Sequence, residues 1–158
     1  MPVHTLRPWL GTLARVLVAA VWIAAGASKI GDLAASGRAV NAYELFPVAA
    51  GRVIGAALPF VELTLGALLL LGVATRLAAW LSAALLASFT AGIASVWARG
   101  LSIDCGCFGG GGAVDPGQTT YGRELLRDAG FLLLAGWLVV RPRTRAVLSL
   151  PGRRRERV

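Results

Sequence analysis

Two cysteines separated by one glycine are the residues of this chain whose type and spacing could support redox chemistry. Cys105 and Cys107 are the only cysteines among 158 residues, and they lie in DCGCFGGGG, which runs from Asp104 to Gly112. Cysteines this close can form a disulfide only if the chain turns tightly, which Gly106 permits because it has no Cβ. So small a ring is strained, and strained, exposed disulfides are the readily reduced ones. The spacing therefore predicts a redox-active pair.

Two other interpretations of the cysteines stay open. A closed zinc site requires four ligands, but the chain adds only one histidine, His4, which lies far from the pair in sequence. The cysteines could instead be inert or separately paired. Asp104, Gly106 and Phe108 surround the pair and are expected to support the loop, and the charge of Asp104 tends to raise the pKa of a neighbouring thiol. The glycines that follow lack the GK[ST] of a phosphate loop and indicate a low-bulk strip that another protein's backbone could approach.

The composition places this loop on a membrane protein. Hydrophobic residues make up 56% of the chain and charged residues 15%, against about 25% charged in soluble domains. Four apolar stretches are each long enough, at ~1.5 Å per residue, to cross a ~30 Å hydrocarbon core: Leu10 to Ile30, Val53 to Leu71, Leu77 to Ala98 and Tyr121 to Val140. The sequence predicts an all-α, polytopic membrane protein, a four-transmembrane-helix bundle over residues 10–140, between an N-terminal tail (1–9) and a basic tail (141–158).

Basic residues predict the orientation of this bundle. The net charge is +8, and seven arginines follow Val140. Because cytoplasmic segments are enriched in Lys and Arg, we expect both termini in the cytoplasm of a bacterial cell and the cysteine loop outside it, where disulfides persist. A basic tail on a membrane-embedded chain argues against nucleic acid as the partner and for membrane lipid. The first stretch also resembles a signal peptide with a small-residue site at Ala25 to Ser28, although Arg15 lies deep within it.

Charged residues inside the apolar stretches form a second candidate site. Glu62 lies at the centre of the second stretch, where a charge costs about 2.5 to 3.5 kcal/mol and is expected to be protonated or paired. Counted from the outer ends at ~1.5 Å per residue, Arg127 lies at a similar depth, so we expect a Glu62–Arg127 contact below the cysteine loop. Asp128 and Glu124 lie near Arg127 on the same predicted helix. These charges could lock helices together, or Glu62 could serve a quinone or thiol reaction.

The segment between the first two stretches is predicted to lie at the outer membrane surface. Pro47 ends any local helix in Asn41–Pro47, and Tyr43 and Phe46 are expected to rest on the bilayer interface. Lys29 and Asp32 are predicted to be interfacial charges, with Lys29 snorkelling toward water.

Four segments of the chain together resemble the MauE family of methylamine-utilisation membrane proteins, which is related to DoxX-like four-helix proteins. They are GASKIGD (26–32), LPFVELTLGALLLLG (58–72), IDCGCFGGG (103–111) and LLRDAGFLLLA (125–135). The resemblance covers roughly residues 8–140. It implies thiol redox chemistry in the maturation of an exported, disulfide-rich enzyme subunit, together with a thioredoxin-like partner.

Carried over by position, the resemblance makes Cys105 and Cys107 the functional pair and implies a polar role for Glu62, Arg127 and Asp128. The leading hypothesis is thiol–disulfide exchange between the outward pair and an exported thioredoxin-like or disulfide-containing protein, which would be an oxidoreductase activity. Two alternatives remain: a non-catalytic membrane scaffold for assembly, and a quinone or small-molecule binder around Glu62. A quinone is the one cofactor that this hypothesis considers.

Overall fold

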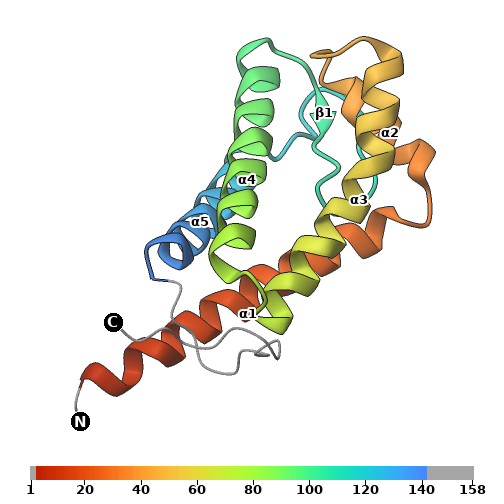
Figure 1. The fold of residues 1–158 in the computed structure, drawn as a ribbon. Coiled ribbons are helices and arrows are strands. Elements are labelled where there is room, and N and C mark those ends of the chain that lie inside the picture. The colour runs from red at the N-terminus through yellow and green to blue at the C-terminus, as the bar shows by residue number, and fades with distance from the viewer. Residues whose placement is uncertain (1–2, 142–158) are drawn as a thin grey trace.

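The computed structural model describes residues 3–141, with side chains from Trp9 onward, and this part of the chain is mostly helical (Figure 1). Its elements are α1 (Val3–Lys29), α2 (Leu33–Ala42), α3 (Val48–Leu71), α4 (Thr75–Ala98), β1 (Ile103–Asp104), β2 (Gly112–Ala113) and α5 (Tyr121–Val140). The basic tail from residue 142 onward and residues 1–2 lie outside the described residues.

Two helix pairs form the frame of the molecule: α1 packs along α3, and α4 packs along α5. Small residues bring α1 and α3 close together. A Cβ on Gly26 of α1 would lie 2.8 Å from the carbonyl oxygen of Pro59, and one on Gly66 of α3 would lie 3.1 Å from that of Ala19. Close backbone approach at small residues is the usual means of helix association in membranes. The core between the pairs includes the buried Trp22.

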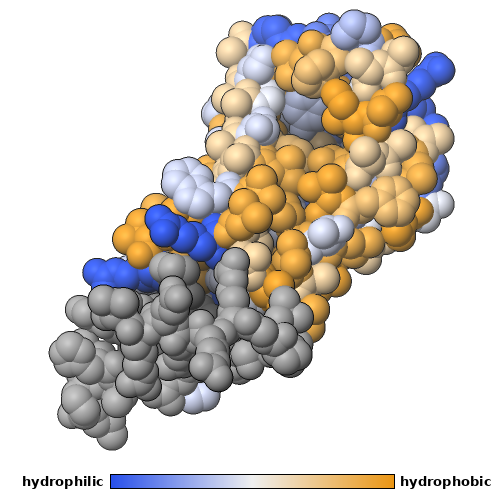
Figure 2. Space-filling model, viewed as in Figure 1, coloured by the Kyte–Doolittle hydropathy of each residue, from blue (hydrophilic) through white to orange (hydrophobic). Residues whose placement is uncertain are grey.

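Three helices of the described part are long and apolar enough to cross a membrane, and they match the first three predicted stretches, except that α1 ends at Lys29 rather than Ile30. They are Trp9–Lys29 of α1, Val48–Leu71 of α3 and Thr75–Ala98 of α4. Large apolar side chains such as Val53, Phe60 and Leu77 are exposed on these helices, and apolar residues cover much of the face shown in Figure 2. Such a surface suits lipid rather than water.

The fourth span stays a prediction. Helix α5 has 20 residues, as expected, but it is not among the three apolar helices. Its first half carries the four charges of GRELLRD (122–128), of which Glu124 and Asp128 are buried. A mostly helical architecture with three apolar helices is therefore confirmed, while the four-span bundle rests on the sequence pattern.

Helix α2 is the helix that the sequence analysis missed. Asp32 is not simply an interfacial charge, because its side chain caps α2 by accepting a hydrogen bond from the Ala35 N–H at 2.8 Å. Glycines seat α2 directly on α3: a Cβ on Gly55 would lie 2.4 Å from the carbonyl oxygen of Ser36, and one on Gly37 would lie 3.1 Å from the Arg52 Cα. The segment after α1 is thus a helix fixed against α3.

Helices α3 and α4 are joined by a tight turn and diverge away from it (Figure 1). Gly72 ends α3 in the left-handed conformation, with φ +71, which lets the chain reverse. At the far end the space between the two helices is closed by α2 and by the loop that carries the cysteines. The turn and the cysteine loop therefore lie at opposite ends of the molecule.

Candidate functional site

A short antiparallel sheet and one tyrosine hold the cysteine loop in place. Ile103 pairs with Ala113 and Asp104 with Gly112. The buried Tyr121, the first residue of α5, accepts a hydrogen bond from the Ile103 N–H at 2.8 Å. Its hydroxyl donates to the carbonyl oxygen of Leu101 at 2.7 Å. The base of the loop is therefore anchored to the start of α5.

The two cysteines face one another across a turn at Gly106, as the spacing predicted. Both are free, half-buried thiols, and the Cys107 N–H donates to Cys105 Sγ at 3.4 Å. Gly106 has φ +66, in the region that favours glycine. Its N–H donates to Asp104 Oδ1 at 3.2 Å. The Asp104 carboxylate also accepts a hydrogen bond from Gly111, at 3.3 Å, so its structural role is to hold the loop together.

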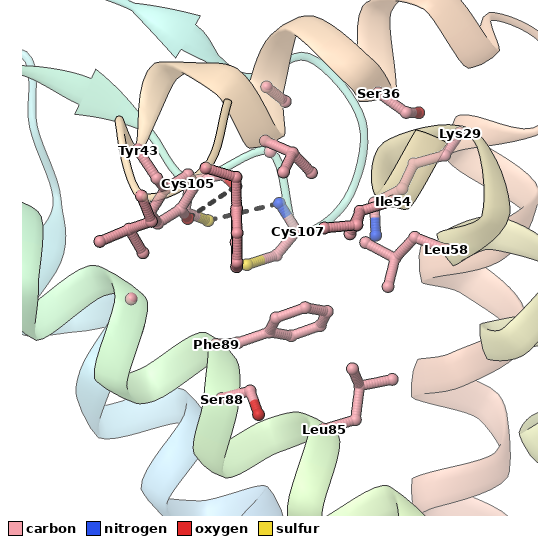
Figure 3. Close-up of a pocket in the computed structure, with 16 residues that line it drawn as sticks. Lys29, Ser36, Tyr43, Ile54, Leu58, Leu85, Ser88, Phe89, Cys105 and Cys107 are labelled. Carbon is pink, nitrogen blue, oxygen red and sulfur yellow. Dashed lines mark hydrogen bonds between the residues drawn. The ribbon is translucent and has the colours of Figure 1, made fainter. Parts of the chain in front are cut away.

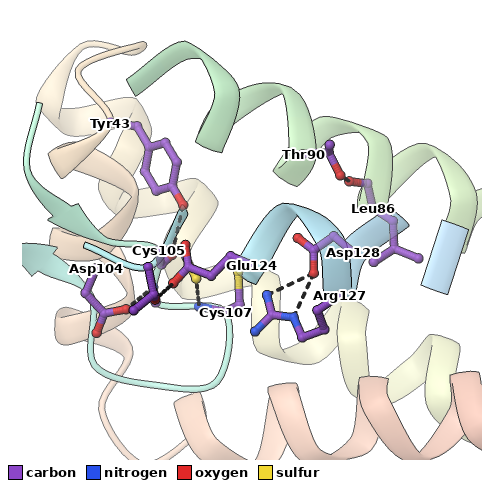
Figure 4. A network of polar contacts seen from close by, with 11 residues as sticks. Tyr43, Leu86, Thr90, Asp104, Cys105, Cys107, Glu124, Arg127 and Asp128 are labelled. Carbon is purple, nitrogen blue, oxygen red and sulfur yellow. Dashed lines mark hydrogen bonds and ion pairs between the residues drawn. The ribbon is translucent and has the colours of Figure 1, made fainter. Parts of the chain in front are cut away.

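Helix α2 forms the platform on which this loop rests. A Cβ on Gly106 would lie 3.0 Å from the Ala39 Cβ, and one on Gly111 would lie 2.5 Å from it. The glycines therefore let the loop backbone touch α2. The Tyr43 hydroxyl, just after α2, donates to the carbonyl oxygen of Cys105 at 3.0 Å (Figure 4).

Tyr43 was predicted to rest on the bilayer interface, and that prediction is wrong. Its half-buried ring packs in a cluster with Ile93 and Ile103, and its hydroxyl supports the cysteine loop. Burial raises the pKa of Tyr43 above its usual value, and the nearby thiols and carboxylates add to the effect. Tyr43 therefore remains a hydrogen-bond donor. Phe46 is 50% exposed, and its position at the bilayer interface stays a prediction.

The hydrogen bond between the cysteines makes them chemically unequal. The Cys107 thiol and N–H donate to Cys105 Sγ, and this lowers the pKa of Cys105, although burial opposes the shift. The same pairing and burial raise the pKa of Cys107. Because the thiolate is the reactive form of cysteine, Cys105 is the better leaving group and the readier nucleophile of the two.

Glu124, like Tyr43, lies near the cysteine pair although the sequence analysis did not place it there. One carboxylate oxygen of Glu124, one of Asp104 and Cys105 Sγ lie within 4.8 Å of one another. Thr120 donates to Glu124 Oε1 at 3.0 Å, whereas Oε2 is buried with no hydrogen-bond partner. A carboxylate in this position can take up a thiol proton. The same three groups could also contribute ligands to a metal ion, one short of the four that a closed zinc site requires.

Arg127 connects α5 to the tip of the loop. Its guanidinium carbon lies 5.0 Å from the centre of the Phe108 ring, which is close enough for a cation–π contact. The guanidinium also pairs with Asp128, at 2.9 Å (Figure 4). The structure thus brings Phe108, Arg127 and Asp128 to the same site as the cysteines.

The expected Glu62–Arg127 contact is wrong, because Glu62 pairs with Lys29 instead. Lys29 Nζ lies 2.5 Å from Glu62 Oε1, and the two side chains are 4% and 0% exposed. Helices α1 and α3 run antiparallel, because Gly26 meets Pro59 and Gly66 meets Ala19. The long side chain of Lys29 therefore extends back along α1, toward the helix N-terminus, to reach Glu62. Glu62 and Arg127 lie at similar predicted depths below the outer ends of their helices, but depth alone does not show which helix faces Glu62. Lys29 is therefore buried rather than snorkelling at the interface.

A cavity of about 240 Å³ lies below the loop, between α2, α3 and α4. Cys105, Gly106 and Cys107 line it from the loop, and Lys29 lines it from the end of α1 (Figure 3). The Glu62 of the sequence analysis does not line the cavity; its partner Lys29 does. Of the residues that the sequence analysis missed, Tyr43 and Lys29 face this cavity, and Glu124 lies beside Cys105. For Lys29 and Glu124, the signal that could have found them was a charge within a predicted apolar stretch; nothing in the sequence marked Tyr43.

Comparison with known proteins supports the membrane architecture. No curated protein and no solved structure matches the sequence. Residues 7–141 match the family described as "Methylamine utilisation protein MauE". This match covers most of the chain, including the apolar helices and the cysteine loop. The chain therefore belongs to the MauE family of methylamine-utilisation membrane proteins.

Proposed function

We propose that the protein exchanges disulfides, through Cys105 and Cys107, with an exported thioredoxin-like or disulfide-containing protein. This exchange supports the maturation of an exported protein, and family membership makes an enzyme of methylamine utilisation the first candidate for it. The observation that carries the proposal is the hydrogen bond between the cysteines. The Cys107 N–H and thiol stabilise a thiolate on Cys105. Such stabilisation is expected of a pair that alternates between the disulfide and the dithiol.

The exchange proceeds by two thiolate attacks. A thiolate of the partner attacks one sulfur of the oxidised pair, the Cys105–Cys107 bond breaks, and the other sulfur leaves as a thiolate. The partner's second thiolate then attacks its own sulfur in the mixed disulfide. The partner gains a disulfide, and the pair is left as two thiols. Glu124, near Cys105 Sγ, can hold the proton that the thiol and thiolate forms of Cys105 exchange.

The loop is arranged for approach by another protein. Asp104 and Phe108 are exposed, and so is Gly110. Because the glycine strip carries no side chains, a partner's backbone could come close to the sulfurs. We propose that this end of the molecule faces the extracytoplasmic side, with both termini in the cytoplasm.

Trapping the mixed disulfide tests the proposal. Cells that express Cys105→Ser or Cys107→Ser would be quenched with acid and analysed without reductant. We expect a partner attached through the remaining cysteine, which reductant releases. The double variant Cys105→Ser/Cys107→Ser should trap nothing, and Ser102→Ala in the same loop should behave as the wild type.

The scaffold alternative gives the opposite result. A scaffold would still support maturation of the exported protein in the double serine variant, because its cysteines would serve only as a local structural cross-link. Full maturation with the double variant would therefore contradict disulfide exchange. Labelling of Cys105 and Cys107 by a membrane-impermeant thiol reagent in intact, reduced cells would test the outward orientation, and labelling only after permeabilisation would contradict it.

A further inference from the structure

We propose that the cavity below the cysteine loop binds the ring of a lipid-soluble quinone, which takes two electrons from Cys105 and Cys107. This inference rests on the proposed function, because a pair that oxidises its partner is left reduced and needs an acceptor. The chain offers no second cysteine pair to relay electrons. The acceptor must therefore reach the pair itself.

The cavity places a ligand directly against the sulfurs. Both cysteines line it, and Cys107 points into it on the side of Phe89 (Figure 3). The opposite walls come from α3 and α4, through residues such as Leu58 and Leu85. A molecule inside would thus contact the pair from below, while a protein partner would approach the same loop from outside.

The size and the walls of the cavity suit one substituted ring. Its volume is about 240 Å³, whereas a dry cavity of about 150 Å³ holds benzene and drug-sized ligands occupy roughly 300 to 1,000 Å³. The lining is mostly apolar and includes the rings of Phe46, Phe89 and Tyr43. Aromatic side chains stack favourably on a flat ring.

The mouth of the cavity favours a ligand that arrives from lipid. Leu45, Phe46 and Ile54 line the cavity and are also 47%, 50% and 39% exposed. Ile54 lies on α3, one of the three helices apolar enough to cross a membrane. Figure 2 shows a hollow with apolar residues at its rim in the upper part of the molecule. An entrance of this composition selects a molecule that partitions into the bilayer over one dissolved in water.

Lys29 distinguishes this cavity from a groove for a lipid tail. Its side chain is 4% exposed and lines the cavity, and its Nζ lies 6.0 Å from the centre of the Phe89 ring. Glu62 takes one of the three ammonium donors. The others can serve an acceptor oxygen of a ligand, and a fixed positive charge stabilises the negative charge that grows on a quinone oxygen during reduction. A hydrocarbon chain would use neither property.

The redox step balances between the pair and the quinone. The two cysteines lose two electrons and two protons: both S–H bonds break, and one S–S bond forms. The quinone gains the two electrons, and two O–H bonds form at its carbonyl oxygens. Glu124 beside Cys105 provides one route for a thiol proton. The quinol then leaves to the bilayer, and the disulfide is ready for the partner.

Reduction of a short-chain quinone tests the inference. Reduced, desalted protein in detergent would be mixed without oxygen with ubiquinone-1, and quinol formation would be followed by ultraviolet absorbance while thiols are counted. We expect one quinol for each pair oxidised. Ser88→Trp and Leu58→Trp fill the cavity from two helices and should slow the reaction by at least about tenfold, since small displacements of reacting groups are costly. Ala91→Trp, exposed and outside the cavity, should react as the wild type.

Two results would overturn the inference. One is oxidised thiols or quinol appearing at the same rate in Ser88→Trp, Leu58→Trp and Ala91→Trp. The other is no quinol at all from reduced wild-type protein that still forms the partner's mixed disulfide, which would leave disulfide exchange intact. Quinone binding can also be detected in a protein that is unable to exchange disulfides. Cys105→Ser/Cys107→Ser cannot reduce quinone, but it should still be photolabelled by an azidoquinone within residues 85–92, and that labelling does not depend on the proposed function.

Discussion

Loss of Lys29 should destabilise the protein more than loss of any surface cation. The Lys29–Glu62 pair is 2.5 Å long, both side chains are at most 4% exposed, and Glu62 Oε2 has no hydrogen-bond partner. Removing one member of a buried pair leaves a buried charge without compensation, which costs about 3 to 5 kcal/mol. We expect Lys29→Met to lose that amount, or roughly 6 to 20 °C in Tm for a chain of this size.

Two further variants make this prediction specific. Lys29→Met combined with Glu62→Leu removes both charges, and it should recover most of the loss because an apolar pair of similar volume is often neutral or stabilising. Arg38→Met breaks the Arg38–Asp32 pair, which is 3.6 Å long and 67% and 61% exposed; it should cost at most about 1 kcal/mol.

Thermal unfolding of five proteins in the same detergent would give the comparison: the wild type, Lys29→Met, Glu62→Leu, the double variant and Arg38→Met. The coupling between positions 29 and 62 follows from the double-mutant cycle. If Lys29→Met and Arg38→Met lost the same stability, or if the double variant were as unstable as the sum of its single changes, the buried ion pair would not be the stabilising element inferred from the structure.

Three other predictions concern the cysteine loop. Cys107→Ala removes the thiol that donates to Cys105 Sγ, so the pKa of Cys105 should rise. Alkylation of Cys105 near pH 7 should then slow by about tenfold for each unit of pKa, which a pH profile of labelling would show. An unchanged profile would contradict the hydrogen bond between the two thiols. Tyr43→Phe removes the 3.0 Å hydrogen bond to the Cys105 carbonyl oxygen, and hydrogen exchange in the loop should accelerate while helix protection is retained. Gly106→Ala meets both φ +66 and the Ala39 Cβ at 3.0 Å, so it should cost about 1 to 2 kcal/mol and hinder disulfide formation, measured by thiol counting after mild oxidation.

The sequence predicted the features that depend on local pattern. The apolar stretches predicted where α1, α3, α4 and α5 end to within one residue, because length and hydropathy are properties of the chain alone, although α1 and α3 begin earlier than predicted. The turn between the cysteines was likewise predictable, since glycine readily adopts the positive φ that a tight turn requires. Helix α2 was missed because it is short and low in overall hydropathy. The glycine contacts with α3 that hold it are not visible in either segment alone.

The partners of the buried charges could not be predicted, for a related reason. Glu62 was expected to need a partner, and it has one, but three helices could have supplied it. The choice of Lys29 over Arg127 depends on the face that α3 turns toward α1, which close packing at Gly26 decides. Glu124 was considered only as a neighbour of Arg127 on the same helix, whereas its approach to Cys105 depends on how the loop folds back over α5.

The platform under the loop has a consequence for the energetics of the pair. Ala39 and Tyr43 line the cavity, and both also touch the loop, Ala39 beneath the Gly106 and Gly111 backbone and Tyr43 at the Cys105 carbonyl oxygen. Any change of loop shape between the dithiol and the disulfide therefore alters the wall of the cavity and its affinity for a ligand. By thermodynamic linkage, a ligand in the cavity alters the equilibrium between dithiol and disulfide to the same extent. A molecule that binds the disulfide form ten times more tightly than the dithiol form lowers the reduction potential of the pair by about 30 mV. Occupancy of the cavity would in this way set how strongly oxidising the loop is toward its partner.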